Sequence, residues 1–379
     1  MLTDELRKDL EKQQYRIVGN HSTVKPCHWT KSMMKGEGEC YKYTFYGIRS
    51  HRCLQMSTAL SCANRCLFCW RGHKEPVTES WEGPIDDPEM ILNESIKAQG
   101  DILVGFKGND KVSPKMFEEA CNPKHVALSL IGEPIIYPKL NKYLDLCNKR
   151  GISTFMVTNG QYPKAMDDMN QVSQFYLSVD APNKELLRKV DVPLFKDYWE
   201  RLNLALDILA NRKDRTAIRI TVIKGMNDIE PENYAKLINK GNPDFVEIKA
   251  YVCVGASRDR LTIDNMPMHE EVIEFTKKIA KHLPDYELNA EHIRSRVALL
   301  THKKYKDESG QWNTWIDFDK WEKLSTEDSE NKGIDWNEYN MKTPKSFIGI
   351  SGKGTKDIVS PHQKKKLARD AGSEMDLDV

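Results

Sequence analysis

Residues 61–70 read S-C-A-N-R-C-L-F-C-W, and this stretch places Cys62, Cys66 and Cys69 within eight residues of one another. We call these three residues the first cysteine triplet. Cysteines that gather so closely in an otherwise ordinary chain indicate a metal centre or a catalytic site. Most metal sites built from cysteine use four protein ligands, so the pattern leaves open what fills the fourth position.

Three interpretations of the first cysteine triplet compete. A structural zinc ion needs a closed tetrahedral set of ligands, which Cys53 or His73 could complete. An incidental cluster of core thiols fits the spacing poorly. A 4Fe-4S cluster held by only three thiolates would leave one iron open to bind a small molecule.

A second group of cysteines precedes the first. Cys27, Cys40 and Cys53 follow a C-x12-C-x12-C spacing, which lies outside the usual range for zinc fingers. We call them the second cysteine triplet, and their pattern predicts another three-thiolate site with an open position; separate buried thiols are the alternative. The remaining cysteines are scattered, and we expect small buried hydrophobic residues at Cys121, Cys147 and Cys253.

From about residue 56 onward, short apolar runs alternate with helical patterns. Strands followed by helices with short links predict an α/β fold with a parallel sheet covered by helices, and periodicity does not say whether this sheet closes into a barrel. The expected strands are 126–130, 154–158, 175–179, 217–223 and 245–251, and the expected helices lie at about 139–149, near 164, up to about 210, from 231 and through 282.

The chain before this region has a different pattern. Residues 1–16 predict an amphipathic helix that Thr3 or Asp4 would cap. Residues 17–55 read as irregular and carry the second cysteine triplet. We therefore expect an N-terminal extension that is organised around something other than a large apolar core.

The C-x3-C-x2-C spacing, with an aromatic residue directly before the last cysteine, resembles the motif of the radical S-adenosylmethionine (SAM) enzymes. The resemblance implies a partial (β/α)6 barrel and a 4Fe-4S cluster whose open iron is chelated by SAM, so the missing ligand would be the cofactor. Further positions match the superfamily pattern around SAM, although the same residue types are common in strand-to-helix turns. They are Phe68 near the adenine, Gly132 and Glu133 near the methionyl amino group, and Asn159, Ser178 and Asp180 near the ribose and carboxylate.

Three longer stretches narrow the resemblance to one family. F-C-W-R-G (68–72), V-E-I-K-A-Y-V-C-V-G-A-S-R (246–258) and E-H-I-R-S-R-V (291–297) are similar to the tRNA 4-demethylwyosine synthases of wybutosine synthesis. The resemblance extends over about residues 20–320. The flavin-binding domain of eukaryotic members has no counterpart in the sequence, so we expect the shorter archaeal form and an external one-electron donor of flavodoxin or ferredoxin type.

The resemblance also implies a reaction. A radical derived from SAM would take a hydrogen atom from the methyl group of N1-methylguanosine, the base immediately 3′ of the anticodon in tRNA-Phe. The resulting carbon would join a two-carbon unit from pyruvate and close the third ring of 4-demethylwyosine. The second cysteine triplet would hold an auxiliary 4Fe-4S cluster that receives pyruvate, and Lys42, two residues past Cys40, would form a Schiff base with it. Without the resemblance, Lys42 reads as an ordinary solvated lysine.

The expected division of the chain follows from these patterns. The N-terminal extension with the auxiliary cluster ligands would span 1–55, the radical SAM barrel 56–302, and a C-terminal extension 303–352. Residues 353–379 are rich in Gly, Ser, Lys and Asp and read as a flexible charged tail.

A net charge of +1 excludes a globally basic nucleic-acid binder, so any RNA-binding surface must be local. The basic stretch 294–306 is one candidate, with an ordinary solvated face as the alternative, and Arg258 and Arg260 are further candidates near the pocket mouth. No apolar run is long enough to span a membrane, and the N-terminus does not resemble a signal peptide. We expect a cytoplasmic monomer.

Two alternative functions are compatible with the residues themselves. One is a radical SAM maturase with an auxiliary cluster that acts on a peptide. The other is a zinc-stabilised RNA-binding module without catalysis. The metal that the cysteines bind separates the enzymes from the module, and the substrate separates the two enzymes.

Overall fold

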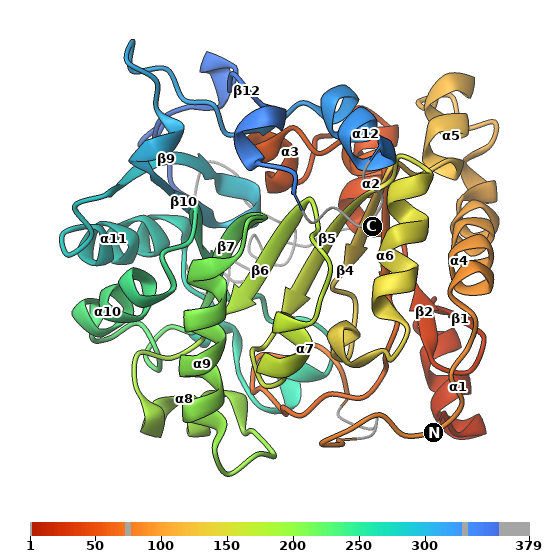
Figure 1. The fold of residues 1–379 in the computed structure, drawn as a ribbon, viewed down its shortest axis with the longest axis horizontal. Coiled ribbons are helices and arrows are strands. Elements are labelled where there is room, and N and C mark those ends of the chain that lie inside the picture. The colour runs from red at the N-terminus through yellow and green to blue at the C-terminus, as the bar shows by residue number, and fades with distance from the viewer. Residues whose placement is uncertain (1, 73–76, 328–332, 356–379) are drawn as a thin grey trace, which may run out of the picture.

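The computed structural model describes residues 2–72, 77–327 and 333–355, and its main feature is one curved sheet of ten strands (Figure 1). The strand order is β1-β2-β3-β4-β5-β6-β7-β8-β10-β9. The six central strands run parallel, and each pairs with the next one along the chain. They are β3 (Cys53–Ser57), β4 (His125–Leu128), β5 (Ser153–Thr158), β6 (Gln174–Ser178), β7 (Arg215–Val222) and β8 (Phe245–Ala250). The α/β prediction of a partial (β/α)6 barrel is confirmed.

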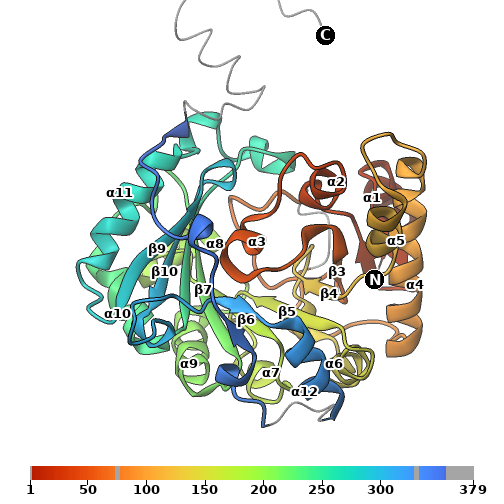
Figure 2. The ribbon, with the colours of Figure 1, turned by 90° about the horizontal axis from the view of Figure 1, so that it is seen from above.

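Helices cover the convex face of this sheet, as Figure 2 shows. Successive strand side chains point to opposite faces, and those on the convex face are mostly aliphatic and buried against the helices. Each large apolar side chain buried there contributes about 1.5–3 kcal/mol. The covering helices are α4 (Pro88–Leu103), α5 (Pro114–Cys121), α6 (Leu140–Lys149), α7 (Pro163–Asp167), α8 (Lys184–Asp191), α9 (Tyr198–Asn211), α10 (Pro231–Gly241) and α11 (His269–Ala280).

Antiparallel strands extend the sheet at both edges. β1 (Arg16–Val18) and β2 (Ser22–Val24) add to β3, while β10 (Val297–His302) and β9 (Tyr286–His292) add to β8. The predicted irregular stretch 17–55 is therefore wrong in part. Three-residue strands are held by pairing with distant partners, and they leave too short a pattern to read in a sequence.

The first helix is shorter than predicted. α1 spans Asp4–Lys12, and the Thr3 hydroxyl caps it by accepting a hydrogen bond from the Leu6 N–H at 3.2 Å. The chain then leaves the helix because Gln14 adopts a left-handed conformation with φ of 66°. The expected cap at Thr3 is confirmed, and the expected end at residue 16 is wrong.

Two helices of the N-terminal extension fill the open side of the sheet. α2 (His28–Met34) and α3 (Tyr41–Tyr46) follow β2, and α3 lies within the curve of the strands (Figure 2). Phe45 and Tyr46 are fully buried there among aromatic residues of the barrel interior. The extension thus shares the apolar core of the barrel, contrary to the expectation from its sequence.

The C-terminal extension packs against α3. It contains β11 (Trp315–Ile316), α12 (Phe318–Glu327) and β12 (Asn340–Met341). The Thr314 hydroxyl donates to the Phe45 carbonyl at 2.7 Å, and the Trp315 indole N–H donates to the Thr44 carbonyl at 3.1 Å. Hydrogen bonds between residues that are 269 and 271 positions apart in the sequence therefore hold α3 in place. The predicted tail lies outside the described residues from 356 onward.

None of the helices in the described part of the chain is both long and apolar enough to cross a membrane. The predicted division into 1–55, 56–302 and 303–352 stays a prediction. The first parallel strand begins at Cys53, and the strands of the N-terminal extension belong to the same sheet as the barrel.

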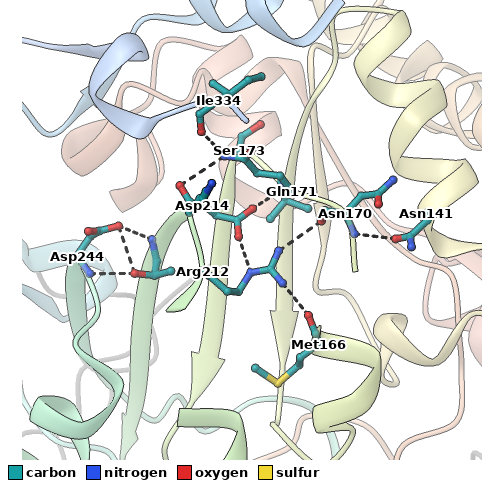
Figure 3. Close-up of polar contacts among 12 residues, drawn as sticks. Asn141, Met166, Asn170, Gln171, Ser173, Arg212, Asp214, Asp244 and Ile334 are labelled. Atoms are coloured by element: carbon teal, nitrogen blue, oxygen red, sulfur yellow. Dashed lines mark hydrogen bonds and ion pairs between the residues drawn. The ribbon is translucent and has the colours of Figure 1, made fainter. Parts of the chain in front are cut away.

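A network of hydrogen bonds and ion pairs links the N-terminal ends of neighbouring strands (Figure 3). The buried Asp214 carboxylate accepts a hydrogen bond from the Val172 N–H at 2.5 Å and forms an ion pair with Arg212. The same guanidinium donates to the carbonyl of Met166 at 2.7 Å and to that of Asn170 at 3.4 Å. This network joins the starts of β6 and β7 on the side of the sheet away from the loops that follow the strands.

We expect Asp214→Ala to lower the free energy of unfolding by about 3 kcal/mol, because it leaves a buried guanidinium and a buried N–H without their acceptor. The melting temperature, followed by circular dichroism, measures this loss. Asp207→Ala is the matched control, because its carboxylate is 56% exposed and 3.4 Å from Lys240, and such pairs contribute about 0–1 kcal/mol. Equal melting temperatures for the two variants would contradict the assignment.

Candidate active site

The first cysteine triplet lies in the loop that follows β3, and contacts with distant segments hold this loop. The Leu67 N–H donates to the carbonyl of Val190 at the end of α8 at 2.8 Å. Arg260 donates to the carbonyls of Leu67, at 3.0 Å, Cys69, and Arg71, at 3.3 Å. Arg260, a candidate RNA contact by sequence, is instead used to hold the cysteine loop.

The thiols of this triplet are withdrawn from solvent. Burial raises the pKa of Cys62 to about 11 and holds that of Cys66 well above its ordinary value. Charges of the other two cysteines, together with Asp191, act on Cys66 in the same direction, so the three thiols are neighbours. Such thiols stay neutral until a metal deprotonates them.

A cavity of about 330 Å3 opens beside this loop. All three cysteines of the first triplet line it, and so does every residue predicted to contact SAM. The structure therefore gathers Phe68, Gly132, Glu133, Asn159, Ser178 and Asp180 around one space.

Gly132 and Glu133 show that this space is shaped for a ligand. Gly132 has φ of 67°, and a Cβ there would lie 1.9 Å from the Ala59 carbonyl oxygen, so only glycine fits. Glu133 is buried, with one carboxylate oxygen accepting from the Asn159 N–H at 3.0 Å and the other without a partner among the described residues. Burial raises the pKa of Glu133 to about 7.

The other predicted cofactor residues differ in how they are held. The Asp180 carboxylate accepts from the Thr221 N–H at 2.7 Å, and burial raises its pKa to about 6. Phe68 packs beside Tyr251 in a small apolar cluster at the edge of the cavity. Ser178 is partly exposed at the end of β6.

The second cysteine triplet also comes together. Cys27 and Cys40 immediately precede α2 and α3, and Cys53 is the first residue of β3. Burial raises the pKa of Cys40 and of Cys53 to about 12. The charge of Cys27 acts on both of these thiols, so the three residues are neighbours although 12 residues separate each from the next.

Lys42 lies beside the second cysteine triplet. Its ammonium is 4.6 Å from the centre of the Tyr176 ring and 5.8 Å from that of Phe155, and both rings belong to the barrel interior. Its charge acts on all three thiols of the triplet. α3 thus places the predicted nucleophile, which is partly buried, against aromatic rings of the barrel interior.

The arrangement argues against Cys53 as the fourth ligand of a zinc ion at the first cysteine triplet. Cys53 belongs to the second cysteine triplet, and His73 lies outside the described residues. Among the residues that are described, no three His, Cys, Asp or Glu side chains converge as ligands of a single ion, and this holds for both cysteine triplets, so it does not separate zinc from iron. Two sets of three thiols that face the barrel interior suit iron–sulfur clusters, whose irons are held by cysteine thiolates.

Sequence reasoning missed two cations of the cavity wall. Arg219 on β7 and Lys249 on β8 both line the cavity. Burial, followed by the charge of Arg219, lowers the pKa of Lys249 to about 7. Their signal was the pair of polar or charged residues two positions apart, R and T in A-I-R-I-T-V and E and K in F-V-E-I-K-A, which marks the polar, inward face of a strand.

The basic stretch 294–306 is not one surface beside the cavity. β10 runs antiparallel to β8, so Arg294 lies at the cavity end of the sheet while Lys303 and Lys304 lie at the opposite end. Lys304 is paired with Asp244 at 2.6 Å. Arg258, in contrast, is exposed in the loop after β8, where the sequence placed a candidate RNA contact.

Of the scattered cysteines, Cys147 is fully buried in the main core, as expected. Cys121 and Cys253 are only partly buried, so the expected full burial is not found for these two residues. All nine cysteines of the described residues are free thiols.

Comparisons with known proteins agree with this geometry. Residues 56–238 match the radical SAM superfamily, and residues 240–302 match the family described as wyosine base formation. The tRNA 4-demethylwyosine synthase TYW1 of Xenopus laevis is 44% identical over 98% of this chain. A solved structure of TYW1 with a lysine–pyruvate adduct bound is 36% identical, with a TM-score of 0.73 over 81% of this chain and 98% of that chain. The chain belongs to the tRNA 4-demethylwyosine synthase family.

A second solved member of the tRNA 4-demethylwyosine synthase family, an archaeal TYW1, is 32% identical with a TM-score of 0.67, covering 81% of this chain and 99% of that one. The chain spans about half the length of the curated relatives it matches, since it covers 51% of the Xenopus laevis protein. The fold and the family of radical SAM enzymes predicted from the sequence are thereby confirmed.

Proposed function

We propose that the protein forms 4-demethylwyosine from pyruvate and the N1-methylguanosine immediately 3′ of the anticodon in tRNA-Phe. One observation carries the proposal: both cysteine triplets and Lys42 face the interior of the same barrel, and Lys249 connects them. Lys249 lines the cavity of the first triplet, and its charge acts on Cys27 and Cys40 of the second. The names of the curated relatives support the same reaction.

The first cysteine triplet would hold a 4Fe-4S cluster with SAM on its open iron. Together they supply the one-electron chemistry that yields a carbon radical able to take hydrogen from a methyl group. The unpartnered oxygen of Glu133 accepts from the methionyl ammonium, and Phe68 borders the adenine. Asn159, Ser178 and Asp180 provide polar groups for the ribose and the carboxylate.

The second cysteine triplet would hold an auxiliary 4Fe-4S cluster next to the pyruvate site. Lys42 acts there as a nucleophile: its neutral amine adds to the ketone carbon of pyruvate, and one water leaves as the imine forms. The aromatic rings beside Lys42 make its surroundings partly apolar, which favours the imine. The lysine–pyruvate adduct bound in the solved TYW1 structure is consistent with a lysine in this role.

The target base of the RNA is in a loop, where a nucleotide can turn outward into a pocket without breaking a duplex. The loop after β8 forms one rim of the cavity, with exposed Val252 and Val254 and the nearby Arg258. Apolar side chains can pack against an extruded base, and the arginine can neutralise a phosphate. Arg294 lies at the same end of the barrel.

The remaining requirements of the reaction are proposals of the same kind. A flavodoxin or ferredoxin would deliver the electron. One chain carries both cysteine triplets and Lys42, so the site is complete in a monomer. Free thiols in this number favour the reducing cytoplasm.

Anaerobic reconstitution followed by turnover tests the proposed function. We expect about eight irons per chain, release of 5′-deoxyadenosine, and incorporation of label from pyruvate into tRNA-Phe that carries N1-methylguanosine. The matched control is the same tRNA with unmethylated guanosine, which offers no methyl hydrogen and should acquire no label. Tightly bound zinc without iron would support the RNA-binding module, and a product formed on a peptide instead of the tRNA would support the maturase.

A further inference from the structure

Glu133, Asp180 and Asp191 line the cavity together with Arg219 and Lys249, so carboxylates and cations share the barrel interior. Lys42, Arg219 and Lys249 all point into it from α3, β7 and β8. Glu247 is the carboxylate nearest to them on β8, and one of its oxygens accepts a hydrogen bond from the Tyr46 hydroxyl at 2.9 Å. No ion pair links Glu247 to any of the three cations within the described ranges. The charges of Glu247 and Asp180 act on Arg219, but no carboxylate of the described residues forms an ion pair with Lys42, Arg219 or Lys249.

Arg219 and Lys249 are close neighbours on adjacent strands. Arg219 is opposite Glu247 in the register, and Lys249 is opposite Thr221, so the two cations occupy diagonal positions on the inner face. The Lys249 ammonium donates one hydrogen bond, to the Ser295 carbonyl at 3.1 Å. The Arg219 guanidinium forms no hydrogen bond or ion pair with any described residue. Donors of both side chains thus remain free to face the cavity.

Two like charges side by side in a partly dry cavity repel each other, and this arrangement is costly unless an anion joins them. The planar guanidinium matches a carboxylate with two parallel N–H groups, and an ammonium adds a further charge-assisted hydrogen bond. A carboxylate is the ligand that this pair fits, because its two oxygens can accept from the guanidinium and the ammonium together.

The position of Lys42 indicates which carboxylate this is. Lys42 and Lys249 both act on the thiols of Cys27 and Cys40, so both side chains border the space beside the second cysteine triplet. A keto acid has its carboxylate on the carbon next to the ketone. We propose that Lys249 and Arg219 bind the carboxylate of the keto acid and thereby present its ketone carbon to Lys42.

This inference rests on the proposed function for the identity of the ligand, and it adds a binding site that neither cysteine triplet explains. The carboxylate of SAM has the same chemistry and enters the same cavity. The two sources are separable, because each ligand can be titrated alone.

The test is binding of pyruvate to the reconstituted enzyme, measured by ligand-observed NMR titration. Lys249→Met keeps the length of the side chain and removes its charge, and we expect it to weaken pyruvate binding at least about tenfold. Lys249→Arg should restore binding to within about threefold, because it restores the charge. Arg219→Gln should weaken binding in the same direction as Lys249→Met.

Hydroxyacetone supplies the internal control, since it is a ketone of the same size with CH2OH in place of the carboxylate. Its affinity should change by less than about twofold in Lys249→Met if only the carboxylate contact is lost. Lys224→Met is the matched control variant. Lys224 lies outside the cavity and forms an ion pair with Glu271 at 2.5 Å, so this change removes one lysine charge without touching the cavity. Iron content verifies that each variant holds its clusters.

Three results would overturn the inference: unchanged pyruvate binding in Lys249→Met, an equal loss for hydroxyacetone, or weaker SAM binding with pyruvate unaffected. Failure of the proposed function looks different. If borohydride traps no adduct at Lys42 while pyruvate binding still depends on Lys249, the nucleophile is wrong and the carboxylate site stands. If the wild-type protein binds no pyruvate, the proposed function and the carboxylate site are both wrong.

Discussion

Replacing any cysteine of the first triplet by alanine is expected to reduce SAM cleavage below detection, whereas the same change in the second triplet should leave cleavage measurable and abolish the tricyclic base. The reason lies in the geometry. Cys62, Cys66 and Cys69 line the cavity that contains the predicted SAM contacts, and the second cysteine triplet surrounds Lys42. Loss of one thiolate removes a ligand that no neighbouring thiol of the other set can replace.

Two assays on anaerobically reconstituted variants measure this separation. Release of 5′-deoxyadenosine without tRNA reports the first site, and label from pyruvate in the tRNA reports the complete reaction. Cys121→Ala is the matched control, because this cysteine is partly buried on α5 and belongs to neither triplet. The division of roles would be refuted if variants of both triplets lost SAM cleavage to the same extent.

Lys42→Ala is expected to eliminate the borohydride-trapped pyruvate adduct and to reduce product formation by at least about a thousandfold, because the covalent step loses its nucleophile. Lys42→Arg should fail equally, since a guanidinium keeps the charge and is not deprotonated in proteins. The adduct is located by mass spectrometry of peptides after treatment with labelled pyruvate.

SAM cleavage without tRNA should survive in both Lys42 variants, and this readout separates loss of the nucleophile from loss of the fold. Lys189→Ala is a suitable control, because the Lys189 side chain is 65% exposed and pairs with Glu185 on the surface of α8. An adduct that persists in Lys42→Ala would remove this residue from the mechanism.

Local patterns were sufficient to predict the barrel and most of the first site. Each of the five expected strands overlaps an observed parallel strand, because buried parallel strands leave apolar runs between helices. The residues at the ends of those strands, such as Glu133 and Asn159, then meet because the ends of parallel strands lie at one edge. In this part of the fold, strands that follow one another in the sequence are also adjacent in the sheet.

The second site could not be assembled in this way. Cys27, Cys40 and Cys53 are brought together by α2, α3 and the start of β3, and hydrogen bonds from the C-terminal extension hold α3. The sequence predicted irregular structure there because helices of six or seven residues carry too weak a pattern. Likewise, only the pairing of β10 with β8 separates Arg294 from Lys303 and Lys304.

By itself, the sequence determined the family and the parallel barrel, and it predicted six thiol ligands from their spacing along the chain. Only the tertiary structure decided that Cys27, Cys40 and Cys53 come close to one another, that Lys42 lies against aromatic rings of the barrel interior, and that Arg219 and Lys249 line the same cavity. The physical reason is that such contacts form when long segments close on one another, and the free energy that closes them comes from side chains buried far away in the chain.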